Sequence, residues 1–140
     1  MFMAARRRQR GGTHIKRILS LVVSAALDKK AEDIRILDLT TLGSITDYFI
    51  VCSGHSSRQT QAIADRIQEV LKESKVRPGH VEGYTAGEWI LMDYVDFVVH
   101  IFTEEKRAYY SLEKLWSDAP RVTPHKTTLR AGGERQEGDS

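Results

Sequence analysis

The sequence predicts an α/β fold whose helices and strands follow the order α-β-β-α-β-β-α. Three observations support this prediction: apolar residues recur at helical spacing near the N-terminus, four short apolar runs alternate with polar turns, and a helix-capping sequence separates the first two runs from the last two. We expect one domain over residues 14–118, between a basic flexible arm (residues 1–13) and a disordered polar tail (residues 119–140).

The first predicted helix has its apolar residues at the i, i+3, i+4, i+7 spacing that places them on one side. These residues are Ile15, Ile18, Leu19, Val22, Val23 and Ala26. Partial alternation over residues 34–39 predicts a strand. The continuous apolar run over residues 48–52 predicts a second strand that is buried on both faces.

The second helix is predicted to begin after Ser56, because Ser56 and Gln59 have the spacing of a capping box, in which the serine hydroxyl accepts from an early backbone amide. Its apolar stripe consists of Ile63, Ile67, Val70 and Leu71. Residues 89–92 and 95–102 predict two further strands, close enough to form a hairpin. A last helix follows and extends to Trp116.

Charge is distributed unevenly along the chain, although the formal net charge is only +2. Residues 1–17 carry +6, residues 18–117 carry −4, and residues 118–140 are neutral. An acidic body argues against nucleic-acid binding as the main activity, because phosphate contacts need a positive face, and it suits a basic protein partner. The arm can still make a minor contact with RNA through Arg6, Arg7, Arg8 and Arg10.

Cys52 is the single cysteine and lies at the end of an apolar run, so we expect a small core residue in a reducing compartment. No apolar stretch approaches the roughly 20 residues that span a bilayer, and the N-terminus lacks the apolar segment of a secretory signal. These features predict a soluble cytoplasmic protein. An arginine-rich organelle transit peptide is the minor alternative.

Two places suggest phosphate or metal chemistry, and each has a simpler interpretation. The turn over residues 53–58 runs from a strand into a helix, as phosphate-binding loops do, but it lacks their glycine patterns, so helix capping is favoured. Asp93 and Asp96 could hold a divalent metal, yet acids are common in turns because they cap local backbone. The five histidines have no ligand spacing, and we expect neither metal nor cofactor.

Acids and large aromatic residues alternate over residues 82–96. Flat rings that anchor and acids that select a basic partner are typical of a binding surface. The alternative, equally supported by the sequence, is that Trp89 and Tyr94 fill the core while the acids face solvent. In the last helix, Tyr109, Tyr110 and Trp116 indicate either core packing or a dimer contact.

Seven short segments of the sequence, taken together, are specific enough to indicate a protein family. They are residues 46–54, 57–59, 63–65, 82–83, Trp89, residues 93–102, and residues 109–116. In this order they resemble the ribosomal silencing factor family (RsfS), also called the Iojap-related family, over about residues 15–117.

The resemblance implies a nucleotidyltransferase-like fold with a mixed four- to five-stranded sheet flanked by helices, without the catalytic carboxylates of active nucleotidyltransferases. It implies a non-enzymatic factor that binds the large ribosomal subunit through the ribosomal protein numbered fourteen. Such a factor sterically blocks association with the small subunit and represses translation under nutrient limitation. Family members often form homodimers when they are free of the ribosome.

The same resemblance implies which residues bind the partner. They are Trp89, Asp93, Tyr94 and Asp96, with Glu82 and His100 as further members. One departure is Val95, where many relatives have glycine; valine resists positive φ, so we expect the turn to differ if theirs requires it.

Two other functions stay open from the sequence. One is a retained nucleotidyltransferase activity that uses Asp93 and Asp96 with a divalent cation and the loop at Gly54 for phosphate. The other is RNA binding by the arginine arm.

Overall fold

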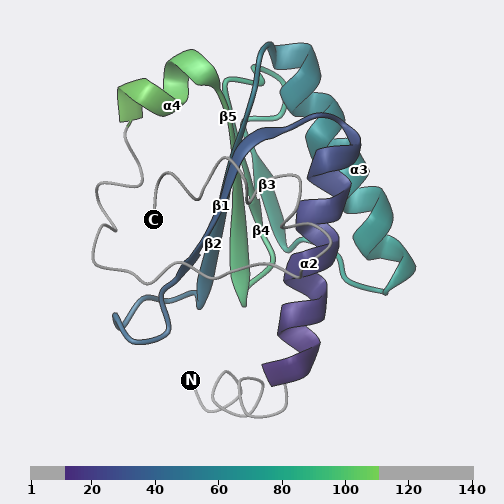
Figure 1. The fold of residues 1–140 in the computed structure, drawn as a ribbon, viewed down its shortest axis with the longest axis vertical. Coiled ribbons are helices and arrows are strands. Elements are labelled where there is room, and N and C mark those ends of the chain that lie inside the picture. Colours follow the sequence, from purple (N-terminus) through teal and green to yellow (C-terminus); the bar gives the residue numbers. More distant parts are fainter. Residues whose placement is uncertain (1–11, 111–140) are drawn as a thin grey trace.

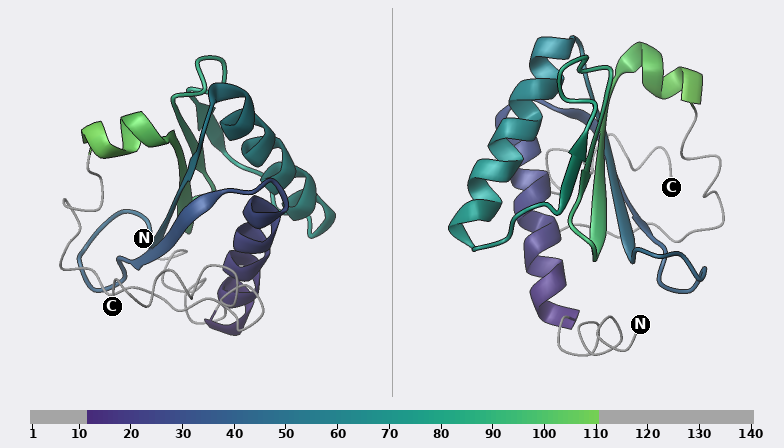
Figure 2. Two further views of the ribbon diagram at one scale, coloured as in Figure 1. Left: turned by 45° about the horizontal axis from the view of Figure 1, so that its top comes forward. Right: turned by 180° about the vertical axis from the view of Figure 1, so that it is seen from behind.

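A computed structural model of the chain describes residues 12–110. Its elements are α2 (Gly12–Asp28), β1 (Glu32–Asp38), β2 (Tyr48–Gly54), α3 (Ser57–Glu73), β3 (His80–Glu82), β4 (Trp89–Asp93), β5 (Phe97–Thr103) and α4 (Glu104–Tyr110). Figures 1 and 2 show a single sheet with α2 and α3 together on one face, while α4 projects from one end toward the other side. The predicted α/β class is confirmed.

The five strands form a mixed sheet in the order β1-β2-β5-β4-β3. Only β2 and β5 are parallel, and the connection between them contains α3, which supplies the length that a parallel crossover needs. The other pairs are antiparallel. The sheet places β2 next to the hairpin of β4 and β5, which comes much later in the sequence.

The structure differs from the prediction in one additional strand and in the bounds of several strands. The short strand β3 was not predicted, because its three residues have no apolar alternation and it forms only by pairing with β4. The strand β5 begins at Phe97 rather than at Val95, because residues 94–96 form the turn that reverses the chain. Any continuation of the last helix beyond Tyr110 lies outside the described residues.

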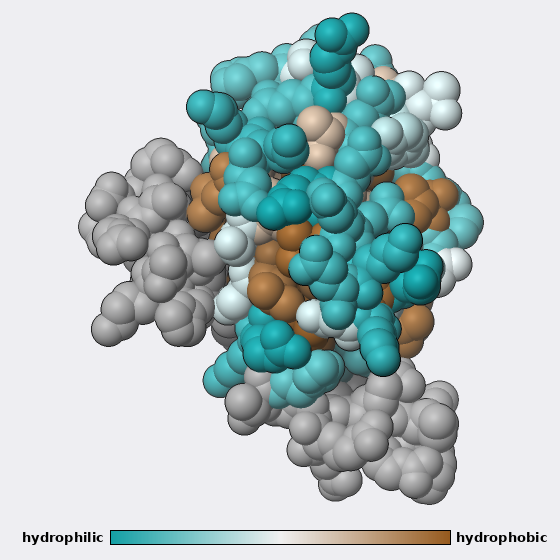
Figure 3. Space-filling view, turned by 90° about the vertical axis from the view of Figure 1, so that its right-hand side faces the viewer, coloured by the Kyte–Doolittle hydropathy of each residue, from teal (hydrophilic) through white to brown (hydrophobic). Residues whose placement is uncertain are grey.

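The main core lies between the sheet and the two long helices. The predicted stripes of both helices point into it, and Ile63, Ile67 and Leu71 of α3 are fully buried. Side chains alternate along the strands, so Ile50, Val99 and Ile101 meet these helices. Each buried aliphatic side chain contributes roughly 1.5–3 kcal/mol to stability. The outer surface of the helices is mostly hydrophilic (Figure 3).

Cys52 belongs to this core, as predicted, and burial raises the pKa of its thiol to about 12. No helix within residues 12–110 is long and apolar enough to cross a membrane.

The alternate strand residues point away from α2 and α3 and form what we call the second face of the sheet. It consists of Phe49, Val51, Trp89, Leu91, Asp93, Val98, His100 and Phe102, with Glu82 at the β3 edge. Within residues 12–110 the only helix on this side is the seven-residue α4, at one end. The second face is therefore the side of the sheet that α2 and α3 do not cover (Figure 2), and Phe49, Trp89, Leu91 and Asp93 are half-buried on it.

The junction between the two long helices is built by Gln59. Its side-chain amide donates to the carbonyl oxygens of Lys29 and Lys30 at the end of α2 (3.0 and 3.1 Å), and its oxygen accepts from the backbone N–H of His55 (2.6 Å). The hydroxyl of Ser56 accepts from the backbone N–H of Gln59 (3.1 Å), which confirms the predicted cap of α3.

Candidate partner-binding site

Trp89 is held at the start of β4 by a loop anchored on α3. The hydroxyl of Thr60 donates to the carbonyl oxygen of Gly87 (2.6 Å), and the hydroxyl of Tyr84 donates to the carboxylate of Asp65 (3.0 Å). Gly83, at φ +79°, approaches so closely that a Cβ there would lie 2.1 Å from the carbonyl oxygen of Trp89. The glycine therefore permits the backbone geometry that presents the indole on the second face.

The indole of Trp89 and the imidazole of His100 form the polar centre of this face. The Nε1–H of Trp89 donates to Nδ1 of His100 at 3.0 Å. His100 is 4% exposed, with its ring 4.5 Å from that of Phe49, and burial lowers the pKa of its imidazole to about 4. The ring is consequently neutral at physiological pH, and Nδ1 is its hydrogen-bond acceptor.

A tight turn closes the end of the sheet beside this pair. The backbone N–H of Asp96 donates to the carbonyl oxygen of Tyr94 (2.9 Å) around Val95, whose φ is +75°. A γ-turn of this hand is strained, and more so with a β-branched residue. Val95 therefore adopts a positive φ although a β-branched residue resists it. The turn is held by Thr46, whose hydroxyl donates to the carbonyl oxygen of Val95 (2.9 Å).

A hollow of about 610 Å³ lies between this turn and the polar centre. Its lining residues come from the loop before β2 and from strands β2, β4 and β5: Ser44, Ile45, Thr46, Phe49, Leu91, Asp93, Val95, Val98 and His100. Ile45 is fully exposed at the rim, and Val95 is 54% exposed. Large apolar side chains in these positions are typical of a contact surface.

The predicted site residues are only partly brought together. Trp89, Asp93 and His100 share the second face, and Glu82 lies in the same row as His100 across β4. Asp96 is half-buried in the adjacent turn. Tyr94 is 7% exposed and stacks on Phe97 within the main core, so its side chain is separate from the others. Of the two sequence interpretations, core packing thus applies to Tyr94, whereas Trp89 is only half-buried on the second face.

The side chains of Tyr109 and Tyr110, and all of Trp116, lie outside the part of the chain that the structure describes, as do Arg6, Arg7, Arg8 and Arg10. What the structure shows of α4 is its attachment. Arg107 is buried and donates through Nη1 to the carbonyl oxygen of Asp33 (2.7 Å) and to the hydroxyl of Ser53 (2.8 Å). The helix is thereby bound to β1 and β2.

Asp93, one of the two carboxylates suspected of metal binding, has a local partner. Asp93 accepts through Oδ1 from the backbone N–H of Val95 (2.8 Å), which is the turn-capping role of an acid. The loop at Gly54 leads into an ordinary cap, and the carboxylates of Glu32 and Glu104 lie beside His55 there. Two negative groups at this position disfavour a phosphate.

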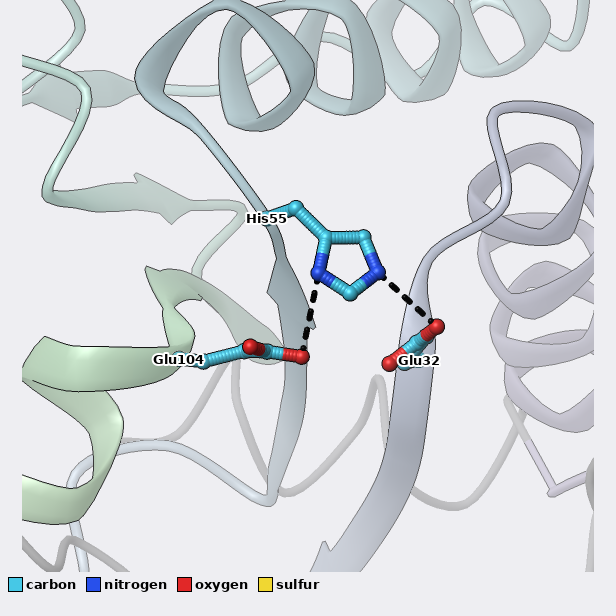
Figure 4. Close-up of side chains that lie close together, drawn as sticks. All are labelled: Glu32, His55 and Glu104. Carbon is cyan, nitrogen blue, oxygen red and sulfur yellow. Dashed lines mark hydrogen bonds and ion pairs between the residues drawn. The ribbon is translucent and has the colours of Figure 1, made fainter.

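His55, Glu32 and Glu104 bring one ligand atom each within 4.8 Å of one another, a grouping that the sequence analysis missed because the residues come from three separate segments. Figure 4 shows the imidazole between the two carboxylates, with Nε2 3.1 Å from Glu32 and Nδ1 3.2 Å from Glu104. Hydrogen bonding to Glu32 is the main cause that raises the pKa of His55. This arrangement suits a protonated imidazole that ties α4 to β1, and all three residues are exposed.

Phe49, Leu91 and Ile45 were also missed by the sequence analysis, although they line the hollow. The first two read as ordinary strand residues, and only the pairing of β2 and β4 with β5 places them beside His100. The sequence of β4 is apolar from Trp89 to Met92 without alternation, so it gave no signal for which residues lie on this face. Taken together, the geometry defines a protein with a mixed α/β sheet whose second face carries aromatic and acidic side chains.

Comparisons with known proteins identify the family. The family model described as "Ribosomal silencing factor during starvation" matches residues 13–140. The ribosomal silencing factor RsfS of Halalkalibacterium halodurans is 45% identical over 105 residues, which cover 75% of this chain and 90% of that protein. A crystal structure of a Chromobacterium violaceum protein superimposes with a TM-score of 0.71 at 41% identity, covering 74% of this chain and 86% of that one.

A more distant relative is the mouse protein named mitochondrial assembly of ribosomal large subunit protein 1, which is 31% identical over 102 residues, 71% of this chain and 45% of that protein. The chain belongs to the ribosomal silencing factor family, whose members are non-enzymatic ribosome-binding factors. Membership confirms the resemblance and the prediction that the protein is not an enzyme, and it removes nucleotidyl transfer as an explanation for Asp93 and Asp96.

Proposed function

We propose that this protein binds the large ribosomal subunit through the ribosomal protein numbered fourteen and sterically blocks association with the small subunit, which represses translation under nutrient limitation. The observation that carries the proposal is the second face. Trp89, Leu91 and Phe49 are each half-buried there, and Leu91 and Phe49 line the same hollow as Asp93. Half-buried rings next to an acid can anchor a protein partner and select a basic one.

The charge of the domain supports a basic protein as the partner. Residues 18–117 carry a net charge of −4, and Glu82, Asp93 and Asp96 place negative groups at or near the second face. Charges arranged in this way accelerate encounter with a positive surface and discriminate against nucleic acid. The partner-binding set that we propose is Trp89, Asp93, Tyr94, Asp96, Glu82 and His100, with Tyr94 contributing through its backbone.

The proposed mechanism is steric: the bound protein occupies the surface at which the two ribosomal subunits join. A factor that covers a joining surface needs affinity and bulk, and no bond has to form or break. Substitutions on the second face should therefore change binding rather than the rate of a chemical step.

We further propose a cytoplasmic protein that forms a homodimer when it is free of the ribosome, with Tyr109, Tyr110 and Trp116 as dimer or core contacts. Residues 14–118 form the binding domain in this proposal. The arm makes a minor contact with ribosomal RNA through Arg6, Arg7, Arg8 and Arg10, and residues 119–140 form a polar tail.

The test is co-sedimentation of the purified protein with isolated large and small subunits, combined with a subunit-joining assay on the same gradients. We expect selective sedimentation with the large subunit and loss of joined ribosomes. Binding to neither subunit, or equal binding to both, contradicts the proposal.

Variants make this test specific to the second face. Trp89→Ala should weaken large-subunit binding by more than about 2 kcal/mol if the ring is an anchor. Asp93→Asn keeps the oxygen that accepts from Val95 but removes the charge, so it should slow association and leave the turn intact. Glu73→Lys, an exposed charge change at the end of α3, is the control and should bind normally.

A further inference from the structure

His100 holds a hydrogen-bond donor for which the described structure provides no acceptor. Trp89 is a donor only, so its 3.0 Å bond to Nδ1 requires that nitrogen to be the acceptor. In the neutral ring the proton must then reside on Nε2. That atom is buried and has no hydrogen-bond partner.

An unsatisfied buried donor is unfavourable by roughly 1–3 kcal/mol, and proteins keep few of them. The imidazole also packs between the rings of Phe49 and Phe102, which are apolar neighbours. A phenylalanine or leucine would fill this position without the penalty. The polar ring is therefore better explained by a contact that the isolated chain lacks.

His100 lines the hollow, and the strand register indicates which edge of its ring lies on that side. Trp89 pairs with Phe102 in the strand register, on one side of His100, whereas Asp93 pairs with Val98 on the other side. Since the Nδ1 edge is turned toward Trp89, the Nε2 edge is turned toward the Asp93 and Val98 end, where the hollow lies.

We infer that the hollow is a recognition pocket in which the Nε2–H of His100 donates to a neutral oxygen, a backbone carbonyl or a hydroxyl, presented by a basic segment of the protein partner. This inference rests on the proposed function and deepens it, because it names the hydrogen bond that selects the segment. His100 is the specificity-determining donor, and Trp89 is a positioning residue that fixes its tautomer.

The charge around the hollow decides the kind of acceptor. Asp93 lines the same hollow, and its carboxylate repels an anionic acceptor while attracting cationic side chains on either side of the inserted group. The apolar walls provided by Ile45, Leu91 and Val98 suit an aliphatic stem. A volume of about 610 Å³ accommodates several side-chain atoms together with a backbone carbonyl.

Two substitutions of His100 separate the donor from the rest of the ring. In His100→Gln the amide reaches the position of Nε2 and can still donate into the hollow. In His100→Asn the amide reaches only the position of Nδ1, so its oxygen can accept from Trp89 while nothing donates into the hollow. Both variants are neutral and polar, and thermal unfolding of each establishes that it is folded.

The measurement is the affinity of each variant for isolated large subunits and for the purified basic partner protein. We expect His100→Asn to bind about tenfold or more weakly, and His100→Gln to stay within about threefold of the unsubstituted protein. Equal affinity of the folded Asn variant and the unsubstituted protein overturns the inference, because the donor then faces only solvent or a water molecule. If the unsubstituted protein itself does not bind the large subunit, the proposed function fails instead.

The pH profile distinguishes a neutral acceptor from a carboxylate. Among the described residues that line the hollow, Asp93 is the only other titratable side chain. A neutral acceptor leaves the imidazole neutral, so affinity should be constant from about pH 8 to pH 6 and binding should take up no protons. Proton uptake on binding, measured by calorimetry in buffers of different ionisation enthalpy, would indicate a carboxylate and contradict the inference.

Discussion

Val95 shows how one residue can be strained and still be tolerated. It adopts φ +75° in the turn between β4 and β5, where glycine has no steric penalty. The surrounding bonds, from Thr46 to its carbonyl oxygen and from its N–H to Asp93, outweigh the strain. The exposed side chain also forms part of the rim of the hollow, which gives the valine a place in the contact surface.

Val95→Gly should stabilise the protein by about 0.5–1 kcal/mol, because relief of roughly 1–2 kcal/mol of left-handed strain exceeds the extra entropy of glycine in the unfolded chain. The matched control is Val95→Ala, which keeps the strained conformation and should not stabilise. Denaturant unfolding measures both. A glycine variant that is less stable than the alanine variant contradicts this explanation of the turn.

Gly83 and Gly43 both have positive φ, at +79° and +73°, but differ in their surroundings. A Cβ on Gly83 would lie 2.1 Å from the carbonyl oxygen of Trp89, whereas a Cβ on Gly43 would meet nothing within 4 Å. Gly43→Ala should cost about 1 kcal/mol from backbone strain alone. Gly83→Ala should cost more than about 2 kcal/mol and should displace Trp89, which its fluorescence spectrum will report.

His100 makes stability depend on pH with a definite sign. Burial lowers the pKa of its imidazole to about 4, against about 6.5 in the unfolded chain, so the unfolded state binds more protons between these values. Stability should fall as the pH falls from about 6.5 to 4, by at most roughly 3 kcal/mol from this residue. Unfolding of His100→Gln at pH 7 and pH 4.5 should show a smaller decrease than the unsubstituted protein.

The contribution of His55 to stability has the opposite pH dependence. Its pKa is raised, chiefly by the hydrogen bond to Glu32, so its contribution is present below about pH 6.5 and is lost as the pH rises through the folded pKa. Repeating the comparison in a His55→Gln background removes this contribution. If stability decreases equally in the unsubstituted protein and in His100→Gln, the imidazole of His100 is not desolvated.

Among the elements, α4 is attached to the sheet by side chains that the structure describes. It is short, and an isolated helix of this length is unstable in water. The buried guanidinium of Arg107 binds it to β1 and β2, and the ion pair between Glu104 and His55 adds an exposed contact (Figure 4). The placement of α4 therefore follows from tertiary contacts and not from helix propensity.

Arg107→Met should destabilise the protein by about 2–3 kcal/mol, because the carbonyl oxygen of Asp33 and the hydroxyl of Ser53 lose a charged donor. Hydrogen exchange should increase first in residues 104–110. Glu105→Gln in the same helix is the control and should leave stability within about 0.5 kcal/mol. Equal exchange in the two variants would mean that other contacts hold the helix.

For the molecule as a whole, the two kinds of charge belong to different regions. The domain is acidic and the first 17 residues are basic, so binding through the second face and contact through the arm respond differently to salt. Removal of residues 1–11 should leave large-subunit affinity within about threefold at physiological salt and should make it less dependent on salt. Loss of binding on this truncation would favour the arm as the main contact and contradict the role of the sheet.

The sequence by itself determined the helices, four of the five strands, the cap at Ser56 and the family. These features depend on local periodicity, capping chemistry and short strings, which can be read along the chain. It also singled out residues 82–96 as a candidate interface, since an alternation of rings and acids is a local pattern. The residues that it left undecided, Trp89 and Tyr94, are ones whose exposure depends on which side of a strand or turn they occupy.

Only the tertiary structure decided that Trp89 lies on the second face while Tyr94 packs in the core, because both are equally apolar in sequence. It alone paired β3 with β4, brought Phe49 and Leu91 beside His100, and fixed the tautomer of that ring through Trp89. The physical reason is that strand register and side-chain hydrogen bonds join residues that lie far apart along the chain. Local patterns contain no information about which distant strand will supply the neighbour.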